Sequence, residues 1–128
     1  MRALLDTHAF LWWISDDCRL SGQAREIIGD GRNELFFSVV SGWEISIKAG
    51  LGRLDVPEDL ESFIADQLSR NAIQGLPIYL RHALYTRVLP DHHRDPFDRI
   101  LVSQAVLEEM SLLSADSQIS SYPIEVIW

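Results

Sequence analysis

The stretch "RALLDTHAFLWWIS" (residues 2–15) contains the pattern from which the fold follows. Residues 2–5 form a short apolar run that ends at Asp6, as expected for a buried strand. Residues 7–14, directly after this acid, predict a short helix. A strand followed at once by a helix is the unit from which parallel sheets are built.

The same alternation continues along the chain. Further strands are expected at 34–40, 73–78, 111–115 and 124–128. Further helices are expected at 21–31, 41–52, 57–71, 79–89 and 96–110. The sequence shows no repeat, linker or low-complexity tract. We therefore predict one α/β/α domain over residues 1–128, with a central parallel sheet of four to five short strands covered by helices on both faces.

The composition limits the class of protein. The chain has 128 residues, of which 47% are hydrophobic, and no apolar run approaches the ~18 residues needed to cross a bilayer. The N-terminal segment already contains Asp6 and His8, which argues against a signal peptide. Cys18 is the only cysteine, so an internal disulfide is excluded and a reducing, cytoplasmic location is expected.

The formal net charge of -8 argues against binding nucleic acid through a simple basic surface. This negative charge is compatible with binding cations or a basic partner. Which of these applies depends on where the acidic residues lie.

Four acids stand at positions that can serve either structure or chemistry. Asp6 and Asp116 follow predicted strands, whereas Glu44 and Asp98 fall in the first turns of predicted helices. Each has a structural explanation: Ser41 with Glu44 matches a capping box, and Asp98 follows a Pro96 that opens its helix. Because the carboxyl ends of parallel strands share one edge of the sheet, at least three of the four acids should meet there.

Converging carboxylates need a cation or a proton. Two unit charges ~4 Å apart repel by about 4 kcal/mol at an effective dielectric constant of 20. Carboxylate oxygens without cysteine ligands select Mg²⁺, Mn²⁺ or Ca²⁺. Such an ion would let an acidic protein cleave an anionic phosphodiester.

Four segments of the chain together resemble the PIN-domain ribonucleases, and above all the toxin components of VapBC-type toxin–antitoxin pairs. They are "LLDTHAFLWW", "SGWEISIKAGLGRL", "HHRDPFDRILVSQA" and "LLSADSQIS", and they come in the family's order. The resemblance implies a Mg²⁺- or Mn²⁺-dependent endoribonuclease on a parallel α/β/α sheet. It implies an RNA substrate, a homodimer, and an antitoxin whose tail occupies a groove near the site.

The resemblance also assigns residues. The family's four acids fall on Asp6, Glu44, Asp98 and Asp116, which are implied to be catalytic and to hold the metal. Thr7 follows the first acid and would bind a metal-bound water or the next amide. Asp95 would be a helix cap or a secondary site residue.

Several other residues have more than one interpretation. Lys48 either pairs with Glu44 four residues earlier or contacts phosphate. The adjacent histidines 92 and 93 either lie in a solvated loop or contact RNA. Trp12, Trp13 and Trp43 could stack on RNA bases, but Trp43 is expected in the core. The arginines considered for phosphate contacts are Arg53, Arg94 and Arg99.

Two alternative functions stay open at this point. In a receiver-like or phosphatase-like domain, an Asp at the end of a strand would itself be phosphorylated. A haloacid-type phosphatase requires the motif Asp-x-Asp, however, and Asp6-Thr7-His8 has no second acid. An inactive interaction module would use the acids only as caps, so its stability would not respond to metal.

Overall fold

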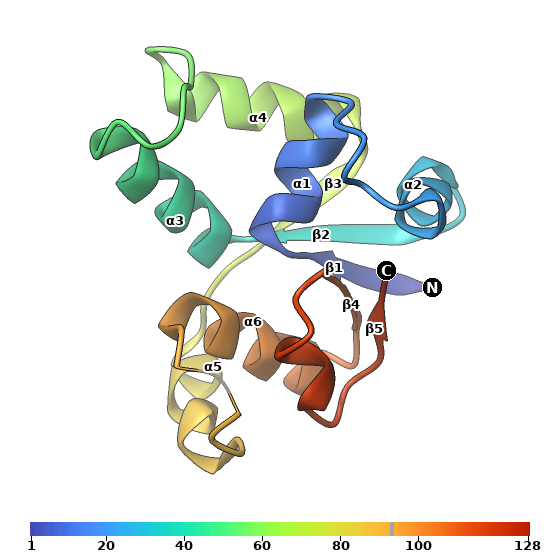
Figure 1. The fold of residues 1–128 in the computed structure, drawn as a ribbon, viewed down its shortest axis with the longest axis vertical. Coiled ribbons are helices and arrows are strands. Elements are labelled where there is room, and N and C mark those ends of the chain that lie inside the picture. Colours follow the sequence, from blue (N-terminus) through green and yellow to red (C-terminus); the bar gives the residue numbers. More distant parts are fainter. Residues whose placement is uncertain (93) are drawn as a thin grey trace.

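The computed structural model describes residues 1–92 and 94–128. Its five strands form one sheet with the order β3-β2-β1-β4-β5, and every pair is parallel. The strands are β1 (Arg2–Leu5), β2 (Glu34–Ser38), β3 (Ile73–Leu76), β4 (Ser111–Leu113) and β5 (Val126–Ile127). The predicted parallel sheet is therefore confirmed, with the N-terminal strand at its centre (Figure 1).

In the described residues, six α-helices and two 3₁₀ helices connect the strands. They are α1 (Thr7–Ile14), α2 (Gly22–Gly29), α3 (Val39–Gly50), α4 (Leu60–Arg70), α5 (Leu80–Tyr85), η1 (Thr86–Val88), α6 (Pro96–Leu107) and η2 (Ile119–Ser121). None of the helices in the described part of the chain combines the length and apolar character that a bilayer crossing requires.

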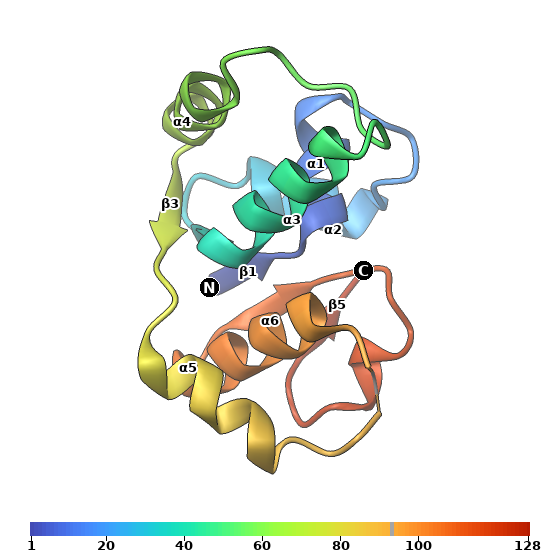
Figure 2. The same cartoon turned by 90° about the vertical axis from the view of Figure 1, so that its left-hand side faces the viewer.

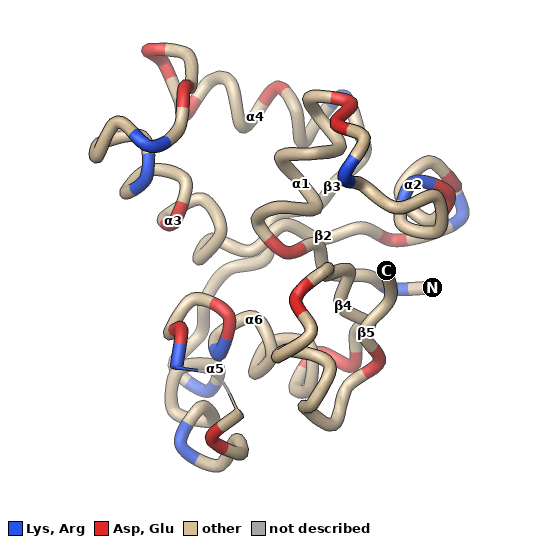
Figure 3. Tube along the Cα trace, in the orientation of Figure 1, with Lys and Arg blue, Asp and Glu red and all other residues tan. Residues whose placement is uncertain are grey.

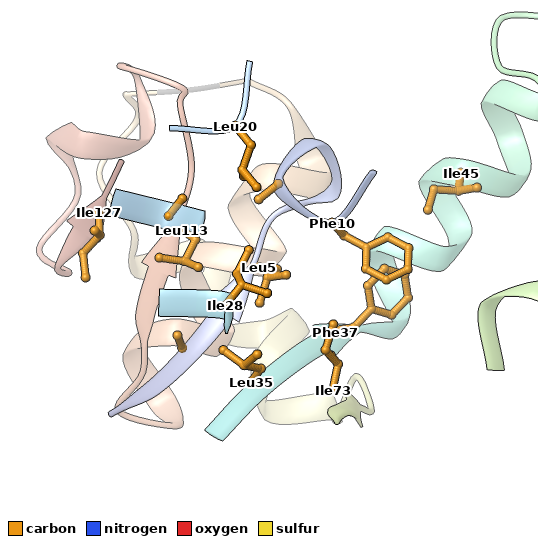
Figure 4. Packing of buried hydrophobic residues seen from close by; sticks show 13 residues of the cluster. Leu5, Phe10, Leu20, Ile28, Leu35, Phe37, Ile45, Ile73, Leu113 and Ile127 are labelled. Carbon is orange, nitrogen blue, oxygen red and sulfur yellow. The ribbon is translucent and has the colours of Figure 1, made fainter. Parts of the chain in front are cut away.

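The two faces of the sheet carry separate cores. Helices α1, α2 and α4 cover one face and α5 and α6 cover the other, as Figures 1 and 2 show. On the first face, Phe10 of α1 packs against Phe37 of β2 with ring centroids 4.4 Å apart (Figure 4). On the second face, Leu101 and Val102 of α6 pack with Leu4 and Leu112 of the sheet. The α6 helix is buried on several sides, as its composition predicted.

Several predicted boundaries were wrong, among them those around α3 and α4. The strand predicted at 34–40 ends at Ser38, whose hydroxyl accepts a 3.1 Å hydrogen bond from the N–H of Val40 and so caps α3. The predicted capping box of Ser41 and Glu44 therefore does not exist, since both residues lie inside the helix. The helix predicted from Pro57 begins only at Leu60, after the N-cap Asp59.

Candidate metal site at the carboxyl edge of the sheet

Asp6 lies at the end of the central strand and begins the helix after it. Its backbone N–H donates to the carbonyl of Leu113 in the neighbouring strand β4, at 3.1 Å. Its carboxylate Oδ1 accepts a 2.7 Å hydrogen bond from the N–H of Ala9, which caps α1. The side chain is therefore fixed between two strands and a helix, and only 6% of the residue is exposed.

The surroundings of Asp6 favour its protonated form. Burial raises the pKa of this carboxyl above its ordinary value of 3.8, and the neighbouring Glu44 raises it further. Hydrogen bonds from Ser114 and Ala9 and the nearby His8 act in the opposite direction without cancelling the effect of burial. A cation close by would therefore stabilise the ionised form of Asp6.

Ser114 is a site residue that the sequence analysis missed. Its hydroxyl is hydrogen-bonded to the Asp6 carboxylate. The same oxygen accepts a 3.1 Å hydrogen bond from the N–H of Asp116. Ser114 comes directly after Leu113, which pairs with Leu5 in the sheet, and this register was the signal that could have identified it. The buried serine thus links the first and last predicted acids.

Glu44 lies in the second turn of α3 because the helix begins at Val39. Thr7 Oγ1 donates a 2.6 Å hydrogen bond to Oε1 of Glu44, and Lys48 Nζ lies 2.9 Å from Oε2. The predicted Glu44–Lys48 pair is therefore present. Since only 7% of Glu44 is exposed, these two partners fix the orientation of a nearly buried carboxylate.

The start of α6 places a further pair of acids. Asp95 is the N-cap residue, with Oδ1 accepting from the N–H of Phe97 at 2.9 Å and of Asp98 at 3.4 Å. Pro96 occupies the first helical turn, where it lacks only an N–H that would have had no partner in the helix. The predicted capping by Asp95 is confirmed, and it holds Asp98 in the first turn.

The four predicted acids line one cavity of about 330 Å³ at the carboxyl edge of the sheet. The lining residues are Asp6, Thr7, His8, Trp12, Glu44, Lys48, Asp95, Asp98, Ala115 and Asp116. Figure 3 shows acidic positions on the elements around this cavity, at the start of α1, on α3 and at the start of α6. The sheet topology thus brings together residues that are far apart in the sequence.

This donor set fits a hydrated hard cation. Among residues 1–92 and 94–128, no three Asp, Glu, His or Cys side chains form a ready-made metal cage. Mg²⁺ does not require one, because it keeps several waters and is commonly held by one or two carboxylates together with substrate phosphates. The acidic side chains that line the cavity supply oxygen ligands, which also suit Mn²⁺.

Several other residues that were considered from the sequence do not line the acidic cavity. Trp43 was expected in the core, but it is 59% exposed, and its ring makes a T-shaped contact with Phe97. Arg99, a candidate for phosphate contact, is half-buried and donates to protein carbonyls. The ring of His92 packs edge-on against Tyr122. The second predicted histidine, residue 93, lies outside the described residues.

A family model and a curated relative match this chain. The model of the PIN domain matches residues 3–125. The chain belongs to the PIN domain family. Ribonuclease VapC16 of Mycobacterium tuberculosis is 34% identical to this PIN domain over 65 residues. That match covers 51% of this chain and 46% of the relative, so about half of each protein is compared.

Solved structures share the fold of this PIN domain. VapBC2 from Rickettsia felis, in a crystal structure with a DNA fragment from its promoter, superimposes with a TM-score of 0.71 and 16% identity. The superposition covers 99% of this chain and 98% of that one. FitAcB from Neisseria gonorrhoeae gives a TM-score of 0.54 at 16% identity, covering 98% and 96% of the two chains.

Proposed function

We propose that this PIN domain is a metal-dependent endoribonuclease that acts as the toxin of a toxin–antitoxin pair. The observation that carries the proposal is the convergence of Asp6, Glu44, Asp98 and Asp116 on one cavity at the carboxyl edge of the sheet. The sequence similarity to Ribonuclease VapC16 supports RNA as the substrate.

The four acids would hold Mg²⁺ or Mn²⁺, directly or through water. When bound, such an ion activates a water for attack on phosphorus and neutralises the charge that builds on the phosphoryl oxygens. The chain's own contribution is orientation. Thr7 and Lys48 hold Glu44 from two sides, and Ser114 fixes Asp6 relative to Asp116.

The antitoxin is proposed to bind in a second groove that adjoins the acidic cavity. This groove has a volume of about 580 Å³ and shares His8, Trp12 and Lys48 with the cavity. The rest of its lining combines apolar side chains such as Leu54 and Phe63 with charged ones such as Asp17 and Arg53. A peptide tail with apolar side chains would fit there, and a basic residue on it could reach the acids.

A second copy of the chain is proposed to cover an exposed apolar face on α3, α5 and η1. Eight large apolar side chains of the described residues are exposed along these elements: Val39, Trp43, Ile47, Leu51, Tyr79, Leu80, Leu84 and Val88. Figures 1 and 2 show α3 and α5 on the same side of the molecule. An apolar patch of this kind usually marks a protein interface.

The decisive experiment measures RNA cleavage by the purified chain without its partner. We expect cleavage with Mg²⁺ or Mn²⁺ and no cleavage in EDTA. Asp98→Asn and Glu44→Gln should lose more activity than the roughly 10–100-fold that is typical when a residue supporting a metal ligand is lost. Asp66→Asn, which changes an exposed acid on α4, is the matched control and should cleave normally.

The same preparation separates the alternatives. A phosphatase-like domain would hydrolyse a small phosphomonoester and leave RNA intact. An interaction module would show neither activity, and its thermal stability would not respond to Mn²⁺. Folded protein that cuts RNA equally well in EDTA would contradict the proposed metal dependence.

A further inference from the structure

Arg99 follows Asp98 on α6 and uses its guanidinium inside the protein. Nη2 donates a 2.7 Å hydrogen bond to the carbonyl of Thr86, which begins η1. Nη1 donates to the carbonyl of Pro90 at 3.0 Å and to the hydroxyl of Tyr122 at 3.1 Å. One side chain thus joins the first turn of α6 to three points elsewhere in the chain.

The contact with Tyr122 reaches the segment that carries Asp116. Tyr122 is buried, and it lies in the connection from β4 to β5 that also contains Asp116. Within this connection, the N–H of Ile119 donates to the carbonyl of Asp116 at 3.2 Å, and the N–H of Tyr122 donates to the carbonyl of Ile119 at 3.1 Å. Main-chain hydrogen bonds thus tie Asp116 to Tyr122 through Ile119, and the Tyr122 side chain carries the connection to Arg99.

A guanidinium is suited to this task and an ammonium is not. Its planar fork carries five donors at fixed angles, so it can bind several separate acceptors at once. A lysine at position 99 would keep the positive charge, but it could not hold Thr86, Pro90 and Tyr122 in the same geometry.

We propose that Arg99 is a positioning residue that fixes the distance between the carboxylates of Asp98 and Asp116. This inference rests on the proposed metal-dependent ribonuclease function, because the spacing matters only if both acids serve the same ion. It assigns Arg99 a role different from the phosphate contact that its charge alone suggests.

The test compares Arg99→Lys with Tyr122→Phe. Tyr122→Phe removes one oxygen that binds Arg99 and leaves the arginine and its charge in place. Tyr85→Phe is the control, since Tyr85 is half-buried and packs against the same core. Each variant is titrated with Mn²⁺ by calorimetry, and kcat and KM are measured on the RNA that the wild type cleaves.

We expect Arg99→Lys and Tyr122→Phe to bind Mn²⁺ on the order of tenfold more weakly, as is typical when a residue supporting a metal ligand is lost. Both should lower kcat and leave KM for RNA unchanged. Tyr85→Phe should resemble the wild type. Thermal melts establish that each variant is folded, and Tyr122→Phe remains informative if Arg99→Lys does not fold.

Three results would overturn the inference. Wild-type Mn²⁺ affinity and kcat in both variants would reject it and leave the ribonuclease proposal standing. A higher KM in Arg99→Lys with a normal Tyr122→Phe would identify Arg99 as a phosphate contact. A wild type that neither binds Mn²⁺ nor cleaves RNA would reject the proposed function, and this inference with it.

Discussion

The hydroxyl of Thr7 donates a 2.6 Å hydrogen bond to Oε1 of Glu44, and both residues are buried. Thr7 directly follows the acid that ends β1, whereas Glu44 belongs to the helix that follows β2. The bond therefore joins two neighbouring β–α units at the edge where the acids meet. It gives Thr7 a definite role, which is to orient a carboxylate.

Replacement of Thr7 by valine should lower the free energy of unfolding by about 1.5–3 kcal/mol. Valine keeps the shape of threonine but removes the donor to Glu44, and hydrogen bonds to charged groups contribute roughly this amount. Thr7→Ser keeps the hydroxyl and should lose much less. Denaturant unfolding of the three proteins measures the difference, and a Thr7→Val protein as stable as the wild type would contradict the prediction.

The pH dependence of stability should reveal the burial of Asp6. Its pKa is raised in the folded protein, so between 3.8 and the folded pKa the folded chain keeps a proton that the unfolded chain has lost. The free energy of unfolding therefore falls as pH rises through this window, and the loss persists at neutral pH. Asp6→Asn, which has no charge to bury, should escape this loss.

The measurement is chemical unfolding of wild type and Asp6→Asn in EDTA from pH 4 to pH 7.5. We expect the variant to be more stable at pH 7.5, by about 0.5–2 kcal/mol, the range that is common for a single stabilising substitution. The advantage should shrink toward pH 4. Asp66→Asn should follow the wild-type curve, and parallel curves for Asp6→Asn would contradict the prediction.

Asp95 should prove to be mainly a helix cap. Asp95→Ala removes the acceptor for the N–H groups of Phe97 and Asp98, and loss of a cap costs about 1 kcal/mol. Asp95→Ser restores a capping oxygen without the charge and should recover most of this stability. RNA cleavage by Asp95→Ser near the wild-type rate would fit a cap, whereas a loss as large as in Asp98→Asn would place Asp95 in the metal site.

The apolar face on α3, α5 and η1 should control the oligomeric state. Leu84 is 65% exposed, so Leu84→Glu should leave the folded monomer intact and shift the protein from dimer to monomer. Ser46→Glu is the control, an exposed change on α3 outside the apolar face. Sedimentation velocity at several concentrations measures the shift. A Leu84→Glu protein that stays dimeric would place the interface elsewhere.

The sequence predicted well which segments form helices and strands and which acids lie at the carboxyl edge of the sheet, because both follow from local patterns. Asp6 and Asp116 stand directly after, or close to, short apolar strands, and a parallel sheet places such residues together. Local signals also explain the cap at Asp95. These predictions needed no knowledge of which strands are neighbours.

Predictions failed where tertiary packing decides between two local patterns. Val39 and Val40 favour a strand, but Ser38 caps a helix and ends the strand before them. Trp43 belongs to an apolar stripe on α3, yet the buried side of this helix carries Val40 and Ile45. A helix with two apolar faces does not specify from its sequence which one faces inward. The role of Ser114 depended on strand register, which no local pattern provides.

The central position of β1 has a consequence for synthesis. This strand is made first, but one of its two neighbours is β4, which the ribosome completes only near the end of the PIN domain. Contacts between distant parts of a chain are slow to form, because closing the intervening loop costs entropy. Asp6 therefore cannot meet Ser114 and Asp116 until β4 and the residues after it have been synthesised. Before that point, the acids of a nascent chain lie apart and form no site.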